Sequence, residues 1–501
     1  MDFLNAISSG FVTAFQPVNL LYCFIGVTVG TLIGVLPGIG PAGTIAILMP
    51  MTFNMSAVSA IIMLAGIYYG AMYGGSTTSI LVNMPGEAAS VVTCIDGYQM
   101  ALKGRAGPAL GISAMGSFIA GMIGLILLAF LAPPFSTVAL SFGYPEYFSL
   151  MVLGMTLVIY LGSGSIVKAL MMAVVGFIFA CVGQDPISGV PRLTYGVDFL
   201  WDGLDIIPII MGLFGISEIL MNLDKEEKLE IFQTRIKGLL PNWDDWRKSA
   251  MPILRGSVLG FFIGILPGSS ATLATFTSYG IEKKFSKHPD EFGKGAIEGV
   301  AGPESANNAA TMGFMVPLLT LGIPVNPVLG MFLAALMIHG TPPGPFLIRD
   351  HGDLFWGVIV SMILGNLMLL ILNLPLIGIW VRVLKVPYKI LFPLILLFCM
   401  IGSYSCNFRV TDMVIMLAAG YFGYLMRRFD YEAPPLVLAL ILGPLMETNL
   451  RQSLIMSRGN LAIFFIRPIS LVCLLLAFFF LFFPLLSYVL KQKRKKSPAP
   501  A

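Results

Sequence analysis

The chain contains the sequence GVLPGIGP at residues 34–41 and the related sequence GILPGSS at residues 264–270. Both stretches lie inside long apolar sequence. Proline removes a backbone donor and glycine frees φ, so each stretch predicts the interruption of a helix at membrane depth. Unpaired backbone at that depth is tolerated only where protein buries it or where it lines a wet cavity. Paired interruptions in the two halves of a membrane protein therefore indicate a transport site.

The composition around these breaks is that of a membrane protein. Hydrophobic residues make up 57% of the chain, charged residues 11%, and the mean hydropathy is +0.87. A soluble domain carries about 25% charged residues. No Asp, Glu, Lys or Arg occurs between Asp2 and Glu87, and further charge-free runs cover residues 108–144, 354–381 and 468–490. We expect an all-α polytopic membrane protein with about 10–12 transmembrane helices plus re-entrant or broken helices.

Several function classes are excluded by what the sequence lacks. The net charge of +4 reflects lysines and arginines in membrane-face loops, which argues against nucleic-acid binding. The six cysteines lie in apolar segments without a CxxC spacing, and the three histidines form no metal-ligand spacing. Since no HExxH, GxSxG or P-loop motif occurs either, we expect neither an enzyme nor a bound cofactor.

The chain divides into five predicted segments. They are a first membrane repeat (1–221), a charged cytoplasmic linker (222–252), a second membrane repeat (253–450), an extra C-terminal transmembrane helix (451–490) and a basic cytoplasmic tail (491–501). Within the first repeat, a span at 57–73 is followed by hydroxyl residues and a Pro-Gly pair at 85–86. This order predicts a re-entrant hairpin.

The charges of equivalent loops predict that the two repeats are inverted. Pro37 corresponds to Pro267, and Pro145 corresponds to Pro387 at a similar separation along the chain. The loop before Pro145 has no Lys or Arg, whereas its counterpart contains three basic residues (Arg382, Lys385 and Lys389). Under the positive-inside rule these loops face opposite sides of the membrane. Arg451, Arg458 and Arg467 argue against this orientation, because it would put them near the outer side.

The residues at the breaks are candidates for binding an anion. Helix N-termini expose free N–H groups and a partial positive charge, and small residues let a carboxylate approach the backbone. The predicted substrate-binding residues are Pro37, Gly38, Ile39, Gly40, Pro41, Asn83, Pro267, Gly268, Ser269, Ser270, Asn307 and Asn308. The alternative is that the Pro-Gly pairs are only structural kinks.

Neutral polar side chains next to the breaks are candidates for a sodium site. The predicted ligands are Ser76, Thr77, Thr78, Glu304 and Ser305. No Asp, Glu, Lys or Arg occurs at positions 305–348, so the carboxylate of Glu304 is costly at membrane depth unless it is functional. Alternatively, Glu304 lies at the membrane surface, and the hydroxyl residues only mediate helix packing.

Four motifs give the chain a family resemblance. The stretch 34–41, the run NMPGEAAS at 83–90, the sequence GPESANN at 302–308 and the segment 442–453 resemble the large permease subunit, TctA type, of tripartite tricarboxylate transporters. The resemblance implies a multi-pass protein of the bacterial inner membrane that imports citrate-like carboxylates with an ion gradient, typically sodium. It also implies two partners: a small four-helix membrane subunit (TctB type) and a periplasmic solute-binding protein (TctC type). An elevator-like movement is compatible with such a fold.

Two other functions compete with this interpretation. A stand-alone cation/proton antiporter would need an intramembrane acid pair, and the apolar spans contain few acids. A membrane-embedded enzyme would need a nucleophile with its base or a metal-binding acidic cluster, neither of which the sequence contains. The carboxylate that is carried, the ion stoichiometry and the oligomeric state do not follow from the sequence.

Overall fold

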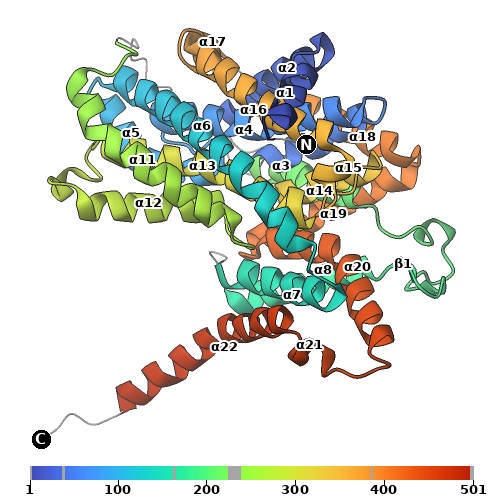
Figure 1. The fold of residues 1–501 in the computed structure, drawn as a ribbon. Helices are drawn as coiled ribbons and strands as arrows, with labels where there is room; N and C mark the ends of the chain where they lie inside the picture. The colour runs from blue at the N-terminus through green and yellow to red at the C-terminus, as the bar shows by residue number, and fades with distance from the viewer. Residues whose placement is uncertain (1–2, 37–39, 162–164, 224–237, 385–387, 497–501) are drawn as a thin grey trace, which may run out of the picture. The chain divides into compact units, whose positions relative to one another are not determined.

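The computed structural model describes residues 3–36, 40–161, 165–223, 238–384 and 388–496. Within these ranges the chain is almost wholly helical, and one short sheet pairs strands β1 and β2 (Figure 1). Seven described helices are long and apolar enough to cross a membrane, and five shorter apolar helices accompany them. The predicted all-α polytopic membrane fold is confirmed.

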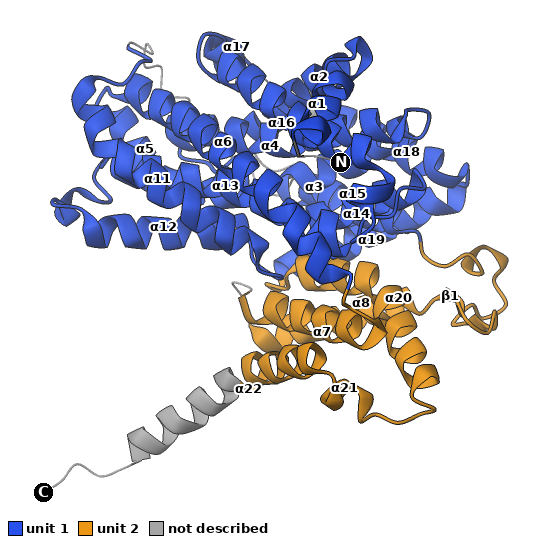
Figure 2. Cartoon of the chain, viewed as in Figure 1, with its two compact units in different colours: residues 1–140, 205–428 blue, residues 141–204, 429–501 orange. Residues whose placement is uncertain are grey.

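The chain forms two compact units (Figure 2). Unit 1 comprises Met1–Leu140 and Asp205–Arg428, and unit 2 comprises Ser141–Leu204 and Phe429–Ala501. Each unit takes segments from both predicted repeats. A repeat and a compact unit are different divisions of a chain, so the predicted repeat boundaries stay a prediction.

The larger unit contains most of the helices. Its elements are α1 (Phe3–Ala14), α2 (Pro17–Val35), α3 (Gly40–Leu48), η1 (Met49–Thr52), α4 (Ala57–Val82), η2 (Ala88–Ser90), α5 (Val91–Leu102), α6 (Ala106–Ala139), α9 (Ile206–Ile210), the π-helical turn η4 (Met211–Ile216), α10 (Ser217–Leu223), α11 (Trp243–Ile265), α12 (Ala271–Phe285), η5 (Pro289–Glu291), α13 (Glu298–Leu321), α14 (Pro327–Ile338), α15 (Leu347–Asp350), α16 (Gly352–Asn373), α17 (Ile377–Val383), α18 (Tyr388–Asn407) and α19 (Val410–Arg428).

The smaller unit is built from α7 (Tyr144–Leu161), α8 (Ile166–Ala180), β1 (Gly183–Gln184), β2 (Pro191–Arg192), η3 (Asp198–Leu200), α20 (Ala433–Met456), α21 (Ile463–Ile466) and α22 (Pro468–Lys496). The two strands pair antiparallel, with Gly183 opposite Arg192. Helix α22 begins in the predicted C-terminal transmembrane segment (451–490) and continues into the predicted basic tail as far as Lys496. Residues 224–237 of the predicted charged linker (222–252) lie outside the described residues, and its last part, from Trp243, belongs to α11.

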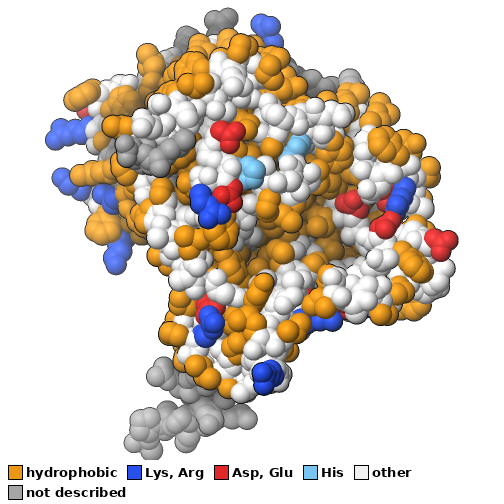
Figure 3. All heavy atoms as spheres, turned by 45° about the vertical axis from the view of Figure 1, so that its right-hand side comes forward, with side chains coloured by type: hydrophobic (Ala, Val, Ile, Leu, Met, Phe, Trp, Pro, Cys, Tyr) orange, Lys and Arg blue, Asp and Glu red, His pale blue; other side chains and the backbone are white. Residues whose placement is uncertain are grey.

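The surface is apolar over large areas. Figure 3 shows one face on which hydrophobic side chains cover most of the area and charged side chains stand in a few small groups. Large hydrophobic side chains on α2, α6, α8, α18 and α19 are exposed. Since apolar side chains gain nothing from contact with water, this surface fits a lipid environment.

Helices α2 and α4 approach each other closely because glycines line their contact. A Cβ atom added at Gly26, Gly30 or Gly34 of α2 would collide with the backbone of α4. The carbonyl groups met there belong, in order, to Met63, Ile67 and Ala71. Small residues at such positions let helix backbones pack tightly in membranes.

The same packing recurs between α11 and α13. Added Cβ atoms at Gly256, Gly260 and Gly264 of α11 would meet the carbonyl groups of Gly302, Ala306 and Ala310 of α13. Each glycine of α11 lies the same number of residues after its counterpart in α2. Each residue contacted on α13 likewise lies a constant number of residues after its counterpart on α4, although this second offset differs from the first. The two helix pairs are therefore copies of one unit.

The equivalent long helices α4 and α13 run antiparallel. Tyr68, in the first half of α4, accepts a hydrogen bond from Asn326, which follows the C-terminal end of α13. Ser76, further along α4, donates to Glu304 near the N-terminal end of α13. Equivalent helices that run in opposite directions are the geometry of an inverted repeat.

The predicted hairpin after Tyr73 is wrong in its position. Helix α4 continues without a break from Ala57 to Val82, and the chain turns only at Asn83. The glycines at 74 and 75 serve close contacts instead: a Cβ at Gly74 would collide with Thr31 of α2, and one at Gly75 would meet Glu87. Glycine in an apolar run thus indicates a close approach as readily as a break.

Replacement by alanine should have opposite effects on stability at a glycine inside the contact between α11 and α13 and at an exposed glycine outside it. A Cβ at Gly260 would lie 2.6 Å from Cα of Ala306, where only backbone movement could relieve the clash. We expect Gly260→Ala to destabilise the protein by about 1–3 kcal/mol. Gly280 on α12 is exposed and meets nothing within 4 Å, so Gly280→Ala should stabilise it by up to about 1 kcal/mol. Thermal unfolding of both variants in nanodiscs checks the two signs, and equal shifts would contradict the packing.

Candidate functional site

Two turns of unit 1 occupy equivalent places in the two repeats. Helix α4 ends at Asn83 (φ 57°) and α13 ends at Gly322 (φ 69°), both in the left-handed conformation. Each turn continues through a proline, and each ends on a side chain that accepts a backbone hydrogen bond and caps the next helix. These capping residues are Glu87, which accepts from the Ala89 N–H, and Asn326, which accepts from the Leu329 N–H. The offset from Glu87 to Asn326 is the one that relates α4 to α13 in the glycine contacts.

Each capping residue also bonds to the long helix of the other repeat. Asn307 of α13 donates from Nδ2 to Oε1 of Glu87 over 3.1 Å, and Asn326 donates from Nδ2 to Oη of Tyr68 on α4 over 3.4 Å. Tyr68 and Asn307 are themselves equivalent positions, since the same offset separates them. The two contacts are reciprocal, so a local two-fold axis passes between α4 and α13.

Beside this axis lies the carboxylate of Glu304, which is 1% exposed. Ser76 donates to its Oε2 over 2.5 Å, and Thr93 of α5 donates to its Oε1. Among the described residues, no Lys, Arg or His pairs with Glu304 or with Glu87, which is 9% exposed. A buried carboxylate without a cationic partner is costly unless a proton or a bound cation compensates its charge. Glu304 therefore lies inside the protein and is not exposed on its outside, while its depth in the membrane stays a prediction.

Three side-chain oxygens on the same stretch of α13 have no described partner. Ser305 Oγ, Asn307 Oδ1 and Asn308 Oδ1 are buried and make no described hydrogen bond. Asn308 uses its amide nitrogen to donate to Ser117 of α6 over 2.7 Å and to the Glu304 carbonyl over 3.1 Å. Buried acceptors are rarely left unpaired, so each needs an explanation such as a bound ion or water. No cluster of three or more His, Cys, Asp or Glu side chains occurs in the described ranges, and the oxygens here suit a hard cation.

The predicted sodium ligands are only partly brought together. Ser76, Glu304 and Ser305 belong to the polar surroundings just described. Thr78 is buried as well, but it donates to the Val35 carbonyl of α2 over 2.7 Å and so joins α4 to the end of α2. Thr77 is buried on the same turn of α4.

The second Pro-Gly break forms as predicted. Helix α11 ends at Ile265 and α12 begins at Ala271, with Gly268 at φ 78° between them. Ser270 caps α12 by accepting from the Leu273 N–H over 3.1 Å, and Ser269 Oγ is buried without a partner. Helix α12 packs against η2, which directly follows Glu87. The break after α11 therefore belongs to a helix pair that packs beside the turn carrying Glu87.

The first break is described in part. Pro37, Gly38 and Ile39 lie outside the described residues, while α2 ends at Val35 and α3 begins at Gly40. Gly40 has φ 65° and accepts from the Thr44 hydroxyl; no described hydrogen bond joins Gly40 or Pro41 to Glu304 or Glu87. Helix α3 packs against α14, the helix that Asn326 caps. Helix α12, which follows the second break, thus packs against η2, which follows the turn at Asn83. Helix α3, which follows the first break, packs against α14, which follows the turn at Gly322.

Sequence reasoning missed several residues of this site. Asn83 ends α4 and is exposed, so it lies apart from the buried groups, whereas Thr93, Ser117, Tyr68 and Asn326 contact them. One signal was available for Asn326: an Asn before a Pro is typical of a helix start. Thr93, Ser117 and Tyr68 carry no such local signal.

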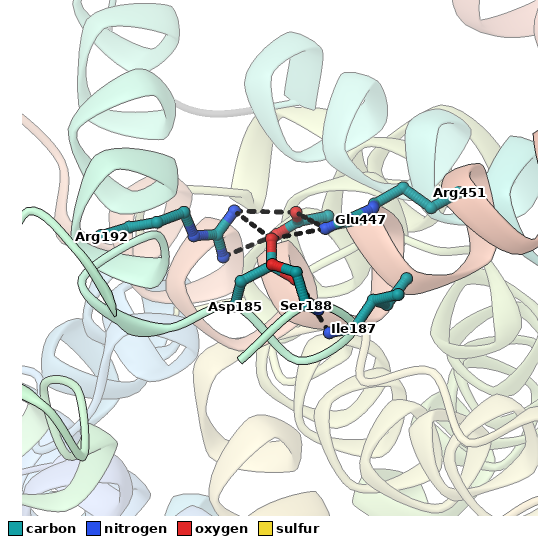
Figure 4. A network of polar contacts seen from close by, with 6 residues as sticks. All are labelled: Asp185, Ile187, Ser188, Arg192, Glu447 and Arg451. Atoms are coloured by element: carbon teal, nitrogen blue, oxygen red, sulfur yellow. Dashed lines mark hydrogen bonds and ion pairs between the residues drawn. The ribbon is translucent and has the colours of Figure 1, made fainter. Parts of the chain in front are cut away.

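A second polar network lies in unit 2 (Figure 4). Arg192 of β2 donates to both carboxylate oxygens of Glu447 on α20 over 2.8 and 3.1 Å, and Arg451 donates to Glu447 and to Asp185 over 3.0 and 2.6 Å. The Arg467 guanidinium likewise pairs with Glu146 at 3.2 Å. Arg451 and Arg467 thus have acidic partners inside unit 2, which weakens their value as indicators of membrane orientation.

Within this network, Asp185 joins the β1–β2 hairpin to α20. The Asp185 carboxylate stays ionised throughout the pH range near neutrality. The Ser188 N–H, the Arg451 guanidinium and the Ile187 N–H all donate to this carboxylate and hold its pKa well below the usual range. A pKa lowered by folding stabilises the fold above the ordinary value of about 3.9, and this contribution is lost only as the pH falls through the lower folded-state value.

We therefore expect the wild-type hairpin to resist proteolysis equally between about pH 5 and 8. Asp185→Asn keeps the side-chain shape but removes the charge, so cleavage of the hairpin should become about tenfold faster across that range. Limited proteolysis in detergent measures this rate. Asp198→Asn, at an exposed position in η3 after the hairpin, is the control, and equal cleavage of both variants would contradict the role of Asp185.

Comparison with known proteins extends over most of the chain. A family model described as "Tripartite tricarboxylate transporter TctA family" matches residues 20–438. A protein of Agrobacterium vitis, described as an uncharacterized 52.8 kDa protein in the TAR-I ttuC' 3' region, is 52% identical over 470 residues, which cover 94% of each chain. Another protein of that organism, described as lying in the TAR-II ttuC' 3' region, is 50% identical over 225 residues, covering 44% of this chain and 93% of its own length. No solved structure matches the chain.

Proposed function

Because the chain belongs to the TctA family of tripartite tricarboxylate transporters, we propose that it is the large membrane permease of a secondary transporter that imports small di- and tricarboxylates. Its partners would be a small four-helix membrane subunit of the TctB type and a solute-binding protein of the TctC type that delivers the substrate. The chain would lie in the inner membrane of a bacterium. It would move its substrate unchanged and would not act as an enzyme.

The substrate site that we propose lies between the breaks of unit 1. A carboxylate would meet the N-terminal ends of α3 and α12, where free N–H groups and the helix dipole favour negative charge. Ser269 supports this site independently, because its buried hydroxyl has no partner and belongs to the break. The second amide hydrogen of Asn307, which the bond to Glu87 leaves free, would complete it, so that the substrate is held by dipoles without a cluster of arginines.

Sodium is the coupling ion that the buried oxygens support best. The observation that carries this proposal is the buried carboxylate of Glu304, without a cationic partner among the described residues, on the same stretch of α13 as three buried oxygens without a partner. A sodium ion bound by Glu304, Asn307 and Asn308 would neutralise the carboxylate and satisfy the free amide oxygens. It would also offset part of the substrate's charge, which links ion binding to substrate binding.

One observation favours a second function. Glu87 and Glu304 both lie against the C-terminal half of α4, and two buried acids are what a cation/proton antiporter needs. Such an antiporter would work without a binding protein and without a carboxylate substrate. The family membership favours the carboxylate permease.

Reconstitution separates the two functions. The full chain and its small membrane subunit are reconstituted in proteoliposomes, the cognate binding protein is added, and uptake of radiolabelled citrate, succinate and malate is measured with an inward sodium gradient. We expect accumulation of at least one of these acids, dependent on the binding protein and abolished when potassium replaces sodium. Sodium–proton exchange without the binding protein, read from an internal pH dye, would support the antiporter and contradict the permease.

A further inference from the structure

Unit 1 contains a cavity of about 520 Å³ that the carboxylate site does not use. It lies between α1, the C-terminal end of α6, α15 with the preceding Pro345, and the first turns of α16. The lining residues are Ala6, Pro133, Ser136, Thr137, Leu140, Pro345, Ile348, Arg349, Gly352 and Trp356.

The lining is apolar apart from one charged side chain. The hydroxyls of Ser136 and Thr137 donate to the carbonyls of Pro345 and Pro133 over 2.6 and 3.1 Å, so their hydrogens are already used. The remaining polar side chain is Arg349. A polar solute such as a free carboxylate would find one cation and few donors here, whereas a hydrocarbon chain would find matching walls.

The charged groups beside the cavity form a mixed pair. Arg349 donates from Nε and Nη2 to both carboxylate oxygens of Asp350 over 2.7 and 3.2 Å, and its guanidinium lies 4.5 Å from the centre of the Phe346 ring. The side chains of Arg349 and Asp350 are 70% and 47% exposed, so both can contact a ligand. Asp353 is exposed one turn further along the chain, and the rim as a whole therefore does not attract a purely anionic group.

The surface next to the cavity is suited to lipid. On α1, Leu4 and Val12 are 78% and 71% exposed, and Leu140 at the end of α6 is 52% exposed. Helix α1 is held against α16 by close contact between Gly10 and Trp356, which also lines the cavity. The cavity thus opens beside a helix with exposed apolar side chains, and helices of this kind can lie where acyl chains and headgroups meet.

We propose that this cavity binds one phospholipid with a zwitterionic headgroup that carries a primary ammonium. One acyl chain occupies the apolar cavity, the phosphate contacts the Arg349 guanidinium, and the ammonium contacts Asp350. Guanidinium groups bind phosphate through paired hydrogen bonds, and an ammonium beside a carboxylate completes the charge match that a net-anionic lipid would lack. Basic side chains at pockets between membrane helices are an established means of holding headgroups.

A cavity-filling substitution tests the acyl chain. A Cβ added at Gly352 meets nothing within 4 Å, so Gly352→Leu extends into open space without a backbone clash. The matched control is Gly378→Leu on α17, which is equally unobstructed but lies away from the cavity. The full-length protein is reconstituted in nanodiscs of phosphatidylethanolamine and phosphatidylcholine, released, and analysed by native mass spectrometry.

We expect one retained phosphatidylethanolamine on the wild type and on Gly378→Leu, and about tenfold lower retention on Gly352→Leu. Size-exclusion profiles of all three proteins check that they stay folded. No retained lipid on the wild type, or equal retention on Gly352→Leu, would overturn the proposal. A co-purifying membrane protein that is lost from Gly352→Leu in place of a lipid would also overturn it and identify the site as a protein interface.

The headgroup is tested by changing the charged pair. Arg349→Gln should reduce retention of phosphatidylethanolamine about tenfold, and Asp350→Asn should abolish its preference over phosphatidylglycerol. In mixed nanodiscs the wild type should select phosphatidylethanolamine over both phosphatidylcholine and phosphatidylglycerol. Equal retention of the three lipids, or preference for phosphatidylglycerol, would contradict the assignment of phosphate to Arg349 and ammonium to Asp350.

Discussion

Replacing Glu304 by glutamine is expected to reduce sodium-driven carboxylate uptake by more than about 100-fold while leaving the protein folded. The glutamine keeps the size of the side chain and can still accept a hydrogen bond from Ser76 or Thr93. It removes the only negative charge among the oxygens proposed to hold sodium. Because a buried charge without a partner costs folding free energy, its removal should leave the free energy of unfolding unchanged or raise it.

The measurement is the initial rate of substrate uptake in proteoliposomes, with thermal unfolding of the same preparation. Glu298→Gln is the matched control, since Glu298 lies on the same helix at a partly exposed position and should transport normally. A Glu304→Gln variant that keeps both its uptake rate and its sodium dependence would exclude Glu304 from the coupling site. A variant that loses both its fold and its uptake would instead assign Glu304 a structural role.

The sequence predicted the break after α11 and not the course of α4. At residues 264–270, a proline without an N–H group is followed by a glycine at φ 78°, and the second of two serines then caps the next helix, so every local preference points to a break. At residues 74–79 the local preferences are weak. Glycines and hydroxyl residues there are compatible with a turn, but contacts with α2 and with Glu87 keep the segment helical.

The polar groups around Glu304 could be predicted only in part. Glu304, Ser76 and Asn307 stand out because polar residues are expensive in apolar sequence. Three of the residues that they or their neighbours contact, Thr93, Ser117 and Tyr68, lie in the first half of the chain. The side chains contacted, those of Glu304, Asn308 and Asn326, lie in the second half. The packing of α4, α5 and α6 of the first half around α13 and its C-terminal turn brings them together. A comparison of the two halves at the offset that the glycine contacts reveal would have aligned Glu87 with Asn326.

The second large effect is expected at the break itself: Gly268→Val should abolish carboxylate uptake while leaving membrane insertion intact. Gly268 has φ 78°, a conformation that a β-branched residue adopts only at a cost of about 1–3 kcal/mol. The break would relieve this strain by rotating the backbone, which would displace Ser269 and Ser270 from the start of α12. The N–H groups proposed to receive the carboxylate would then point elsewhere.

Two further variants separate backbone conformation from side-chain bulk. Asparagine tolerates the left-handed conformation, so Gly268→Asn should keep a substantial part of the uptake that Gly268→Val loses. Gly280→Val adds the same bulk on α12, where φ is ordinary and no atom lies within 4 Å, and it should transport normally. If Gly268→Val transported at the wild-type rate in proteoliposomes, the break would be a structural kink, and the substrate would have to bind elsewhere. If Gly268→Val lost uptake while Gly268→Asn and Gly280→Val kept it, neither side-chain bulk nor helix propensity would explain the difference. The left-handed conformation of Gly268 would then be what orients the N-terminal end of α12 toward the substrate.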